Sequence, residues 1–372
     1  NDACTVTVSG EQTNASATAY TATATILDND KYKLPAEDAD KQTAFIISKA
    51  PLTITAKDHS ITYGEEGASA GLTYTGFVNG ETETTSDLTG TLSFSYCSKS
   101  TDALYLAGSD AGDDYWITAN GLTSNNYAIS FVQGTLTVDP KPLTITAKAQ
   151  TIEYGKGIAK GTDQVTLSID LASTDALAEI TLTPSTEGYT DDGSATITPS
   201  VAVIKRDGVA KTSNYAITYV PGVLKITKKQ LKITAKDKAI TYGDVASNAG
   251  VTYSGFRAGE SENTPGLLSG TLKYDYGGYA PGKDVGEHVI TPSGLTSPNY
   301  YIIYDTGTLT VNKKTVGIAW GETLLTYCDA DIAPVAIATG LYGEDQCDVI
   351  ISGAAKEVGV HQVTATGLSN AN

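Results

Sequence analysis

The stretch Pro51-Leu-Thr-Ile-Thr-Ala-Lys57, followed by Thr62-Tyr63-Gly64, decides the fold because it occurs three times in the chain. The second copy begins at Pro142 and ends in Glu153-Tyr154-Gly155, and the third begins at Gln230, so the starts lie 91 and then 88 residues apart. We call the three endings the TYG blocks. A repeat of this length is typical of one small domain copied in tandem. We therefore read the chain as an array of domains before searching it for functional motifs.

The quoted stretch has the alternation of a β-strand with one buried face. Leu52, Ile54 and Ala56 share one face, and the intervening threonines and Lys57 share the other. The chain has 22 tyrosines, no methionine and 37 glycines, which favours strands with one solvated face over helices. The fold class that we predict is all-β or mainly β, a tandem array of small β-rich domains.

The repeats divide the chain into five segments. Two partial units flank three complete ones of about 90 residues, a size that buries roughly 60–65% of the unfolded surface. We expect the C-terminal part of a unit at 1–49, full repeat 1 at 50–140, full repeat 2 with a divergent middle at 141–228, full repeat 3 at 229–313, and at 314–372 the N-terminal part of a unit that lacks its last strand.

The joints between units have one constant length. The last inward residue of each unit and the first of the next are five positions apart at all four joints, which are Ile47 to Leu52, Val138 to Leu143, Ile226 to Leu231 and Val311 to Val316. A flexible linker would not keep one length four times, so we expect fixed angles between units and an elongated rod. Units about 30–35 Å across would give it a length of roughly 120–150 Å.

The two terminal segments are versions of one unit. Residues 2–10 match residues 345–353 with an offset of 343, and residues 23–27 match residues 364–368 with an offset of 341. Two interpretations remain open. Either the sequence is an excerpt of a longer chain, or subunits polymerise by strand complementation, the N-terminal strands of one chain completing the C-terminal unit of its neighbour.

Composition excludes several classes of function. The formal net charge of −17 and a pI near 4.5 argue against a nucleic-acid partner, because such a chain repels phosphates. No run approaches 18 apolar residues, so the segment holds no membrane span. The sequence contains no signal peptide, and any export or anchoring signal is expected outside it.

The repeated blocks resemble a known family. The series LTITAK or LKITAK, TYG, TGF or SGF, and TGTL or SGTL over 52–138 and 231–311 resembles the MBG (YGX-type) repeats of large bacterial cell-surface, adhesin-like proteins. The middle of repeat 2 lacks the last two blocks. The resemblance implies extracellular stalk domains with a β-grasp-like or Ig-like sandwich fold, located at the bacterial cell surface, and it implies no catalytic residues.

Four cysteines are too few for a disulfide-based scaffold. Cys328 and Cys347 lie 19 positions apart in one unit, and in an exported protein we predict a disulfide between them worth roughly 3 kcal/mol. Cys4 aligns with Cys347, so its partner would lie upstream of residue 1, and Cys97 is expected to be a lone strand cysteine. A zinc site is not expected, because the chain has no CxxC or Cys/His cluster.

No constellation in the sequence indicates an enzyme. His59, His288 and His361 fall in different units, and the nucleophile-elbow, phosphate-loop and HExxH motifs are absent. We therefore predict no catalytic residues and no cofactor.

Two patterns suggest ligand binding, each with a structural alternative. Asp28-Asn-Asp30 and the acidic turn 110–114 bring oxygen atoms together, but ordinary turn chemistry explains them better than calcium does. Tyr274, Tyr276 and Tyr279 are candidate glycan contacts, although alternate strand tyrosines more often pack across a sheet.

The sequence thus favours an extracellular stalk or filament segment, a rigid spacer of tandem β domains. The first alternative is an adhesive module that binds host glycan or mucin, and the second is a filament subunit that polymerises by strand complementation. The expected partners are further repeats of the same chain, neighbouring subunits, or host or cell-surface glycans.

Overall fold

The computed structural model describes residues 4–186 and 195–370 and is nearly all β, which confirms the predicted class. By its internal contacts it divides into two compact units. Unit 1 is Asn1–Lys148, Lys160–Thr183 and Ile197–Gly222, and unit 2 is Ala149–Ala159, Pro184–Thr196 and Val223–Asn372. Repeat 1 lies wholly in unit 1 and repeat 3 wholly in unit 2, so each is described by itself.

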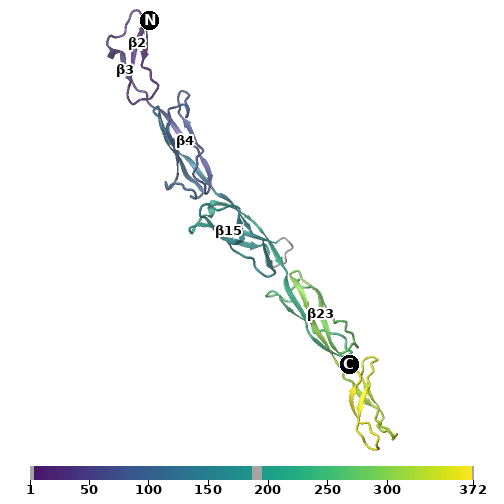
Figure 1. Cartoon of the computed structure of the whole chain (residues 1–372). Helices are drawn as coiled ribbons and strands as arrows, with labels where there is room; N and C mark the ends of the chain where they lie inside the picture. Colours follow the sequence, from purple (N-terminus) through teal and green to yellow (C-terminus); the bar gives the residue numbers. More distant parts are fainter. Residues whose placement is uncertain (1–3, 187–194, 371–372) are drawn as a thin grey trace. The chain divides into compact units, whose positions relative to one another are not determined.

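Repeat 1 consists of two sheets (Figure 1, around β4). The three-stranded sheet has the order β6-β4-β9 and the four-stranded sheet the order β5-β10-β8-β7. Strands β4 and β9 are parallel, as are β5 and β10, and the other neighbours are antiparallel. The bounds are β4 Ala50–Ala56, β5 His59–Thr62, β6 Leu72–Thr75, β7 Thr89–Ser98, β8 Gly112–Thr123, β9 Tyr127–Val132 and β10 Gly134–Asp139.

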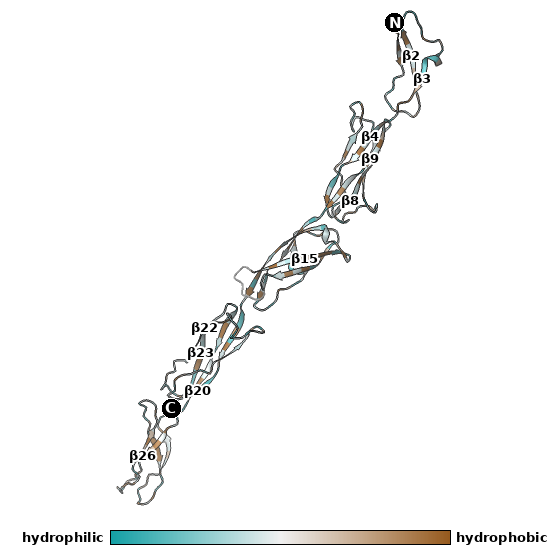
Figure 2. Ribbon diagram, turned by 180° about the vertical axis from the view of Figure 1, so that it is seen from behind, coloured by the Kyte–Doolittle hydropathy of each residue, from teal (hydrophilic) through white to brown (hydrophobic). Residues whose placement is uncertain are grey.

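The predicted alternation of the opening strand is confirmed. Leu52 and Ile54 are fully buried and Ala56 nearly so, while the threonines between them are half-buried. Leu52 and Ile54 pack with Tyr127 of β9 to form the core beneath β4. Figure 2 shows the same alternation as brown apolar positions between paler polar ones on β4 and β9. The hydrophobic effect along this face holds the three-stranded sheet in register.

Repeat 3 has the same topology as repeat 1 (Figure 2, around β20, β22 and β23). Its sheets have the orders β21-β19-β24 and β20-β25-β23-β22, with the same parallel and antiparallel pairs. The bounds are β19 Lys229–Ala235, β20 Lys238–Thr241, β21 Val251–Ser254, β22 Ser269–Asp275, β23 Gly286–Thr296, β24 Tyr300–Asp305 and β25 Gly307–Asn312.

Repeat 2 is divided between the two compact units. In unit 1, β11 (Lys141–Ala147) pairs with β13 (Val165–Leu167) and runs parallel to β17 (Tyr215–Val220). In unit 2, β12 (Gln150–Glu153) runs parallel to β18 (Gly222–Thr227). The remaining elements of the repeat are β14 (Ala176–Pro184), β15 (Thr196–Arg206), β16 (Val209–Ala210) and the 3₁₀ turns η1 (Thr162–Gln164) and η2 (Thr212–Asn214).

The terminal segments pair their strands in the same register, as their sequence match predicts. In the first, β1 (Thr5–Ser9) pairs with β2 (Tyr20–Asp28), and in the last, β28 (Val349–Ser352) pairs with β29 (Thr364–Leu368). Val6 lies opposite Leu27, just as the aligned Val349 lies opposite Leu368, and both ladders have a bulge at the same step. The other elements are α1 (Asp38–Lys41), β3 (Gln42–Phe45), β26 (Gly317–Trp320) and β27 (Ala336–Thr339).

Successive repeats are joined almost without a linker. Strand β10 ends at Asp139 and β11 begins at Lys141, and β18 ends at Thr227 while β19 begins at Lys229. At these two joints one residue therefore separates the closing strand of a repeat from the opening strand of the next. At the first and last joints four residues lie between β3 and β4 and between β25 and β26.

The TGTL and SGTL blocks contain a glycine at a point where two paired strands approach each other closely. A Cβ at Gly90 would lie 2.0 Å from the Gly121 carbonyl oxygen, and one at Gly121 would lie 2.1 Å from that of Thr91. Side-chain atoms do not fit at such distances, so each glycine admits the backbone of the other strand.

We expect Gly90→Ala to destabilise repeat 1 by about 1–3 kcal/mol more than Gly80→Ala, because both glycines have positive φ but only Gly80 has open space around it. Urea unfolding followed by the fluorescence of Trp116 on β8, in a Trp320→Phe background, measures the difference. Equal destabilisation by the two substitutions would contradict the steric account.

Candidate functional site

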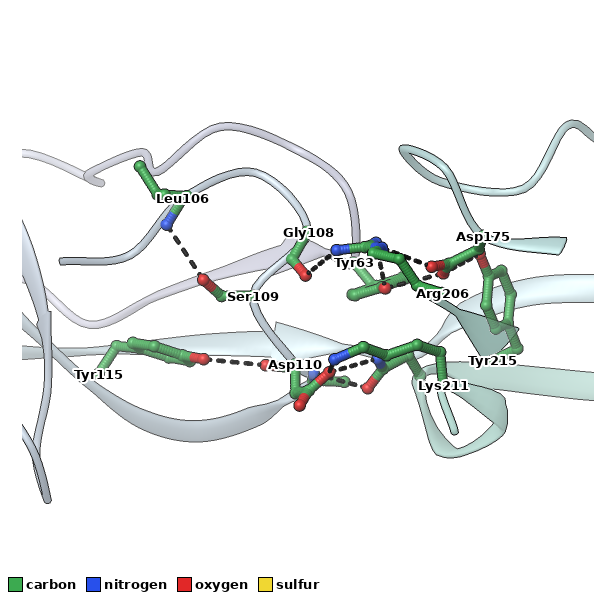
Figure 3. Close-up of polar contacts among 12 residues, drawn as sticks. Tyr63, Leu106, Gly108, Ser109, Asp110, Tyr115, Asp175, Arg206, Lys211 and Tyr215 are labelled. Atoms are coloured by element: carbon green, nitrogen blue, oxygen red, sulfur yellow. Dashed lines mark hydrogen bonds and ion pairs between the residues drawn. The ribbon is translucent and has the colours of Figure 1, made fainter. Parts of the chain in front are cut away.

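The tyrosine of each TYG block lies at a joint between repeats. Tyr63 follows β5, and its amide donates to the carbonyl oxygen of Asp139 at 2.9 Å. The side chain is fully buried, and Figure 3 shows its hydroxyl group pointing at residues of repeat 2. The tyrosine therefore belongs to one repeat by its backbone and contacts the next by its hydroxyl.

The partner of Tyr63 is a buried carboxylate of repeat 2 (Figure 3). Asp175 Oδ2 accepts hydrogen bonds from the hydroxyls of Tyr63 and Tyr215, each at 2.8 Å, and Asp175 Oδ1 accepts from Arg206 Nε at 2.7 Å. The carboxylate side chain has no exposed surface. A buried charge is tolerated only when it is paired and hydrogen-bonded, and three donors meet that need here.

Arg206 closes the arrangement from repeat 2. Its Nη2 donates to the Tyr63 hydroxyl at 2.7 Å, and its Nη1 donates to the carbonyl oxygen of Gly108 in repeat 1 at 2.9 Å. The Tyr63 hydroxyl thus donates to Asp175 and accepts from Arg206, so its orientation is fixed. We call this arrangement of tyrosine and carboxylate the tyrosine clamp.

A second contact accompanies the clamp at the same joint (Figure 3). Asn214 accepts from the Ala111 amide at 2.9 Å and donates to Asp110 Oδ1 at 2.8 Å, and Lys211 Nζ lies 2.6 Å from the same oxygen. Burial opposes ionisation of Asp110, but the hydrogen bonds and charge of these donors prevail and lower its pKa. The acidic turn 110–114, which was considered above as a calcium site, therefore supplies Asp110 to the joint.

The clamp recurs in unit 2. Tyr154, which follows β12, donates to Glu260 Oε1 at 2.5 Å, and Tyr300 of repeat 3 donates to Glu260 Oε2 at 2.5 Å. The Arg257 guanidinium lies 6.0 Å from the centroid of the Tyr154 ring. Tyrosine, carboxylate, second tyrosine and arginine thus occur together again, although the carboxylate is now a glutamate.

A third joint uses a variant of the clamp. Tyr242, which follows β20, donates to Asp345 Oδ2 at 2.8 Å and packs edge-on against the ring of Tyr342 at 6.0 Å. At the other two joints the ring of the second tyrosine packs edge-on against the clamp tyrosine in the same way, at 5.5 and 5.4 Å. The carboxylate, the TYG tyrosine and the edge-on ring are the parts that all three joints share.

Each carboxylate belongs to the same short turn. The amide of the acidic residue donates to the carbonyl oxygen three positions earlier, at 3.0–3.1 Å. The turns are Val78–Glu81, Ala172–Asp175, Arg257–Glu260 and Tyr342–Asp345. In the first three, the amide of the leading residue also donates to the hydroxyl of the tyrosine that begins β9, β17 or β24 and contacts the acid. The first of these turns overlaps the polar run 79–88.

The glycine of the TYG block contacts the same turn of the next repeat. A Cβ at Gly64 would lie 2.7 Å from Ala172 Cβ, and one at Gly243 would lie 2.5 Å from the Tyr342 ring. The same glycine in repeat 2, Gly155, lies against the Arg257 stem. All three have positive φ, so glycine is favoured both by conformation and by the close approach.

The clamp controls the ionisation of its tyrosines. Burial first, and then the hydrogen bond to Asp175, raises the pKa of Tyr63 to about 12. Burial also raises the pKa of Tyr215 and of Tyr300. A phenolate beside a buried carboxylate would be strongly unfavourable, so the clamp requires neutral tyrosines.

Tyr63, Tyr154 and Tyr242 are all buried. The sequence did not reveal their acidic partners, which lie 112, 106 and 103 residues further along. Repeats 1 and 3 do contain a sequence signal for the acid, because Glu81 and Glu260 each lie four positions after the phenylalanine of the TGF or SGF block. Repeat 2 lacks that block, so its sequence does not show that Asp175 is the equivalent acid.

The candidate glycan contacts lie within repeat 3. Tyr279 is buried and donates to the Asp244 carbonyl oxygen at 2.9 Å, while Tyr274 and Tyr276 are half-buried against the same hydrophobic core. The three rings are therefore committed largely to packing. Glycan binding by them remains a prediction.

The predicted bridge between Cys328 and Cys347 is not formed in the structure, in which Cys4, Cys97, Cys328 and Cys347 are free. Cys328 is exposed, and Cys347 lies beside Tyr242 and Tyr342 at the third joint. Within residues 4–186 and 195–370 no group of three His, Cys, Asp or Glu residues is placed to hold a metal ion.

We expect Tyr63→Phe to weaken the first clamp by about 1.5–3 kcal/mol, because a hydrogen bond to a buried charge is lost. In a double-mutant cycle with Asp175→Asn, the two changes should therefore be strongly non-additive. Hydrogen exchange at the Ala111 amide, which donates to Asn214 across the joint, reports the opening of the joint.

The control for this cycle is Glu179→Gln. Glu179 forms an exposed ion pair with Lys205 on the neighbouring strands β14 and β15, so its loss should change exchange by no more than about 0.5 kcal/mol. Additive effects of the Tyr63 and Asp175 substitutions would show that the contact contributes nothing to the joint.

The clamp should fail at alkaline pH. Because the folded pKa of Tyr63 lies above its ordinary value of 10.0, its contribution is complete below pH 10 and is lost as the pH rises toward about 12. Phenolate absorbance against pH should show a late-titrating group of tyrosines, and Tyr63→Phe should remove one of them. Loss of one tyrosine from the early group instead would contradict this assignment.

Comparison with solved structures finds similarity to tandem-domain proteins at low scores. The I9-I11 tandem of titin shares 14% identity, covers 71% of this chain and 100% of its own, and has a TM-score of 0.22. Drosophila N-cadherin EC1-3 shares 10% identity over 69% of this chain and 98% of its own, with a TM-score of 0.19. Scores this low carry no argument about this chain. No curated protein sequence matches it.

Comparison with family models gives a specific result. The model of the MBG domain (YGX type) matches residues 52–137 and 231–310, which are the bodies of repeats 1 and 3. The matched segments contain the TYG blocks whose tyrosines take part in two of the clamps, and the family is generally non-enzymatic. Repeats 1 and 3 of this chain are therefore MBG domains of the YGX type.

Proposed function

We propose that this chain is a structural spacer of an extracellular bacterial surface protein, in which clamped joints hold successive MBG-type domains at fixed angles. The recurrence of the tyrosine clamp at three joints is the observation that carries the proposal. A site that bound a ligand or substrate would not need to be repeated at every boundary between domains. A spacer needs the same device at each boundary.

The energetics of a joint support this role. The first clamp has three hydrogen bonds to its carboxylate, the second has two and the third has one, and each bond of this kind contributes about 1.5–3 kcal/mol. The single residue between Asp139 and Lys141 leaves the backbone little freedom to compensate if the contact opens. Together the short connection and the buried clamp oppose bending, whereas a long Gly/Ser linker would permit it.

The chemistry of the clamp does not suggest catalysis. The Asp175 carboxylate is fully buried and already accepts hydrogen bonds from three donors, so it is not available to bind a substrate. None of the helices described is long or apolar enough to cross a bilayer. A surface location is inferred from the family match and belongs to the proposal.

Small-angle X-ray scattering of the chain should give a radius of gyration of roughly 35–45 Å, the value for a rod of 120–150 Å, and not the roughly 21 Å of a compact particle. The double variant Tyr63→Phe, Asp175→Asn should broaden the distribution of interatomic distances, because one joint becomes flexible. Glu179→Gln should leave the scattering curve unchanged. A compact particle, or a double variant that scatters like the parent chain, would contradict the proposed role as a rigid spacer.

A further inference from the structure

The turn Val78–Glu81 of repeat 1 has the acceptor half of a tyrosine clamp. Glu81 Oε2 accepts from the Tyr127 hydroxyl at 2.5 Å, and the Val78 amide donates to the same hydroxyl at 3.2 Å. Asp175 and Glu260 each accept from a second tyrosine that belongs to the preceding repeat. Among residues 4–186 and 195–370, Glu81 accepts from Tyr127 and from no second tyrosine.

The segment before repeat 1 nevertheless contacts repeat 1 in the same way that repeat 1 contacts repeat 2. Asn126 accepts from the Ala15 amide at 2.8 Å and donates to Asn14 Oδ1 at 3.1 Å. Asn214 makes the same two contacts with Ala111 and Asp110 at the next joint. Two joints thus share one docking geometry, and they differ in whether a tyrosine reaches the carboxylate.

The structure also shows where such a tyrosine would be held. In all three complete repeats, the amide of the clamp tyrosine donates to the carbonyl oxygen of the residue after the last inward position, which is Asp139, Thr227 or Asn312. The constant joint length assigns this position to Ser48 in the first segment. An open cavity of about 520 Å³ lies there, lined by residues 15–17, 46–49 and Asn125, and the Ile46 side chain is 61% exposed.

A strand edge leads toward this cavity. In the complete repeats a short strand, β5, β12 or β20, runs parallel to the closing strand and ends directly before the clamp tyrosine. Strand β3 is the closing strand of the first segment and lies at the edge of the sheet β1-β2-β3. That edge presents backbone groups to which a parallel strand can pair.

We propose that Glu81 and Tyr127 are the receptor half of a fourth tyrosine clamp, whose donor is an extended segment of another repeat that ends in tyrosine and pairs in parallel with residues 45–48, where β3 ends. The donor has an aliphatic residue two positions before its tyrosine. In the three complete repeats this residue is Ile61, Ile152 or Ile240. This inference rests on the proposed function, because it assigns to the first joint the same clamp as the others.

The chain itself contains a segment of this chemistry. Leu325 and Tyr327 have the required spacing, and residues 321–328 form no strand. The side chain of Leu324 is 92% exposed, and that of Tyr327 is 57% exposed. The C-terminal segment can therefore provide a matched donor sequence for the test.

The test is a full chain in which residues 314–344 are joined in front of Asp2, the position that aligns with Asp345. Hydrogen exchange at the amides of residues 46–49 is compared with and without Glu81→Gln. In the extended chain, Glu81→Gln should speed this exchange on the order of ten- to a hundredfold, because the clamp is lost. In the unextended chain it should change the same exchange by less than about twofold.

Two further variants make the result specific to the clamp. Tyr→Phe at the added copy of Tyr327 should reproduce the effect of Glu81→Gln, and the two together should be no worse than either. Tyr→Phe at the original Tyr327 is the matched control and should change nothing. Slow exchange that persists without the added hydroxyl or without Glu81 would show strand pairing without a clamp and would overturn the inference. Scattering by the unextended chain tests the spacer separately, so the two failures are distinguishable.

Discussion

The rest of the arrangement depends on a carboxylate buried between repeats. A charge such as that of Asp175 cannot be left in a dry joint without donors, so the joint must assemble all of them or open. Two of the donors come from the repeat that owns the acid and one from its neighbour. The requirement to satisfy one carboxylate therefore couples the position of one domain to that of the next.

This coupling explains several features that are separate in the sequence. The glycine after each clamp tyrosine admits the turn that carries the acid, and the short turn aims that acid at two hydroxyls. The Asn-Tyr pairs at 126–127, 214–215 and 299–300 supply both the second hydroxyl and, at two joints, an amide that contacts the preceding repeat. Residues that begin a strand within one domain thus also serve the boundary between domains.

The sequence predicted the repeated architecture but not the clamp. Alternation at Leu52, Ile54 and Ala56 identifies a half-buried strand because side-chain direction in a strand has a period of two. The constant spacing between Val138 and Leu143 likewise reflects a local, nearly continuous backbone. The partner of Tyr63 is Asp175, more than one repeat away, and no local pattern encodes a contact across a domain boundary. Pairing of that kind follows only from three-dimensional docking.

The strand order of repeat 1 has a consequence for mechanical load. The chain enters through β4, continues in the same direction through β5, and leaves through β10, which runs parallel to β5. A pulling force along the chain therefore acts along the β5–β10 ladder, so that its hydrogen bonds bear the load together and cannot open one after another. At the exit, force passes through Pro140 directly into β11. Under tension, such a module would transmit force before it yields.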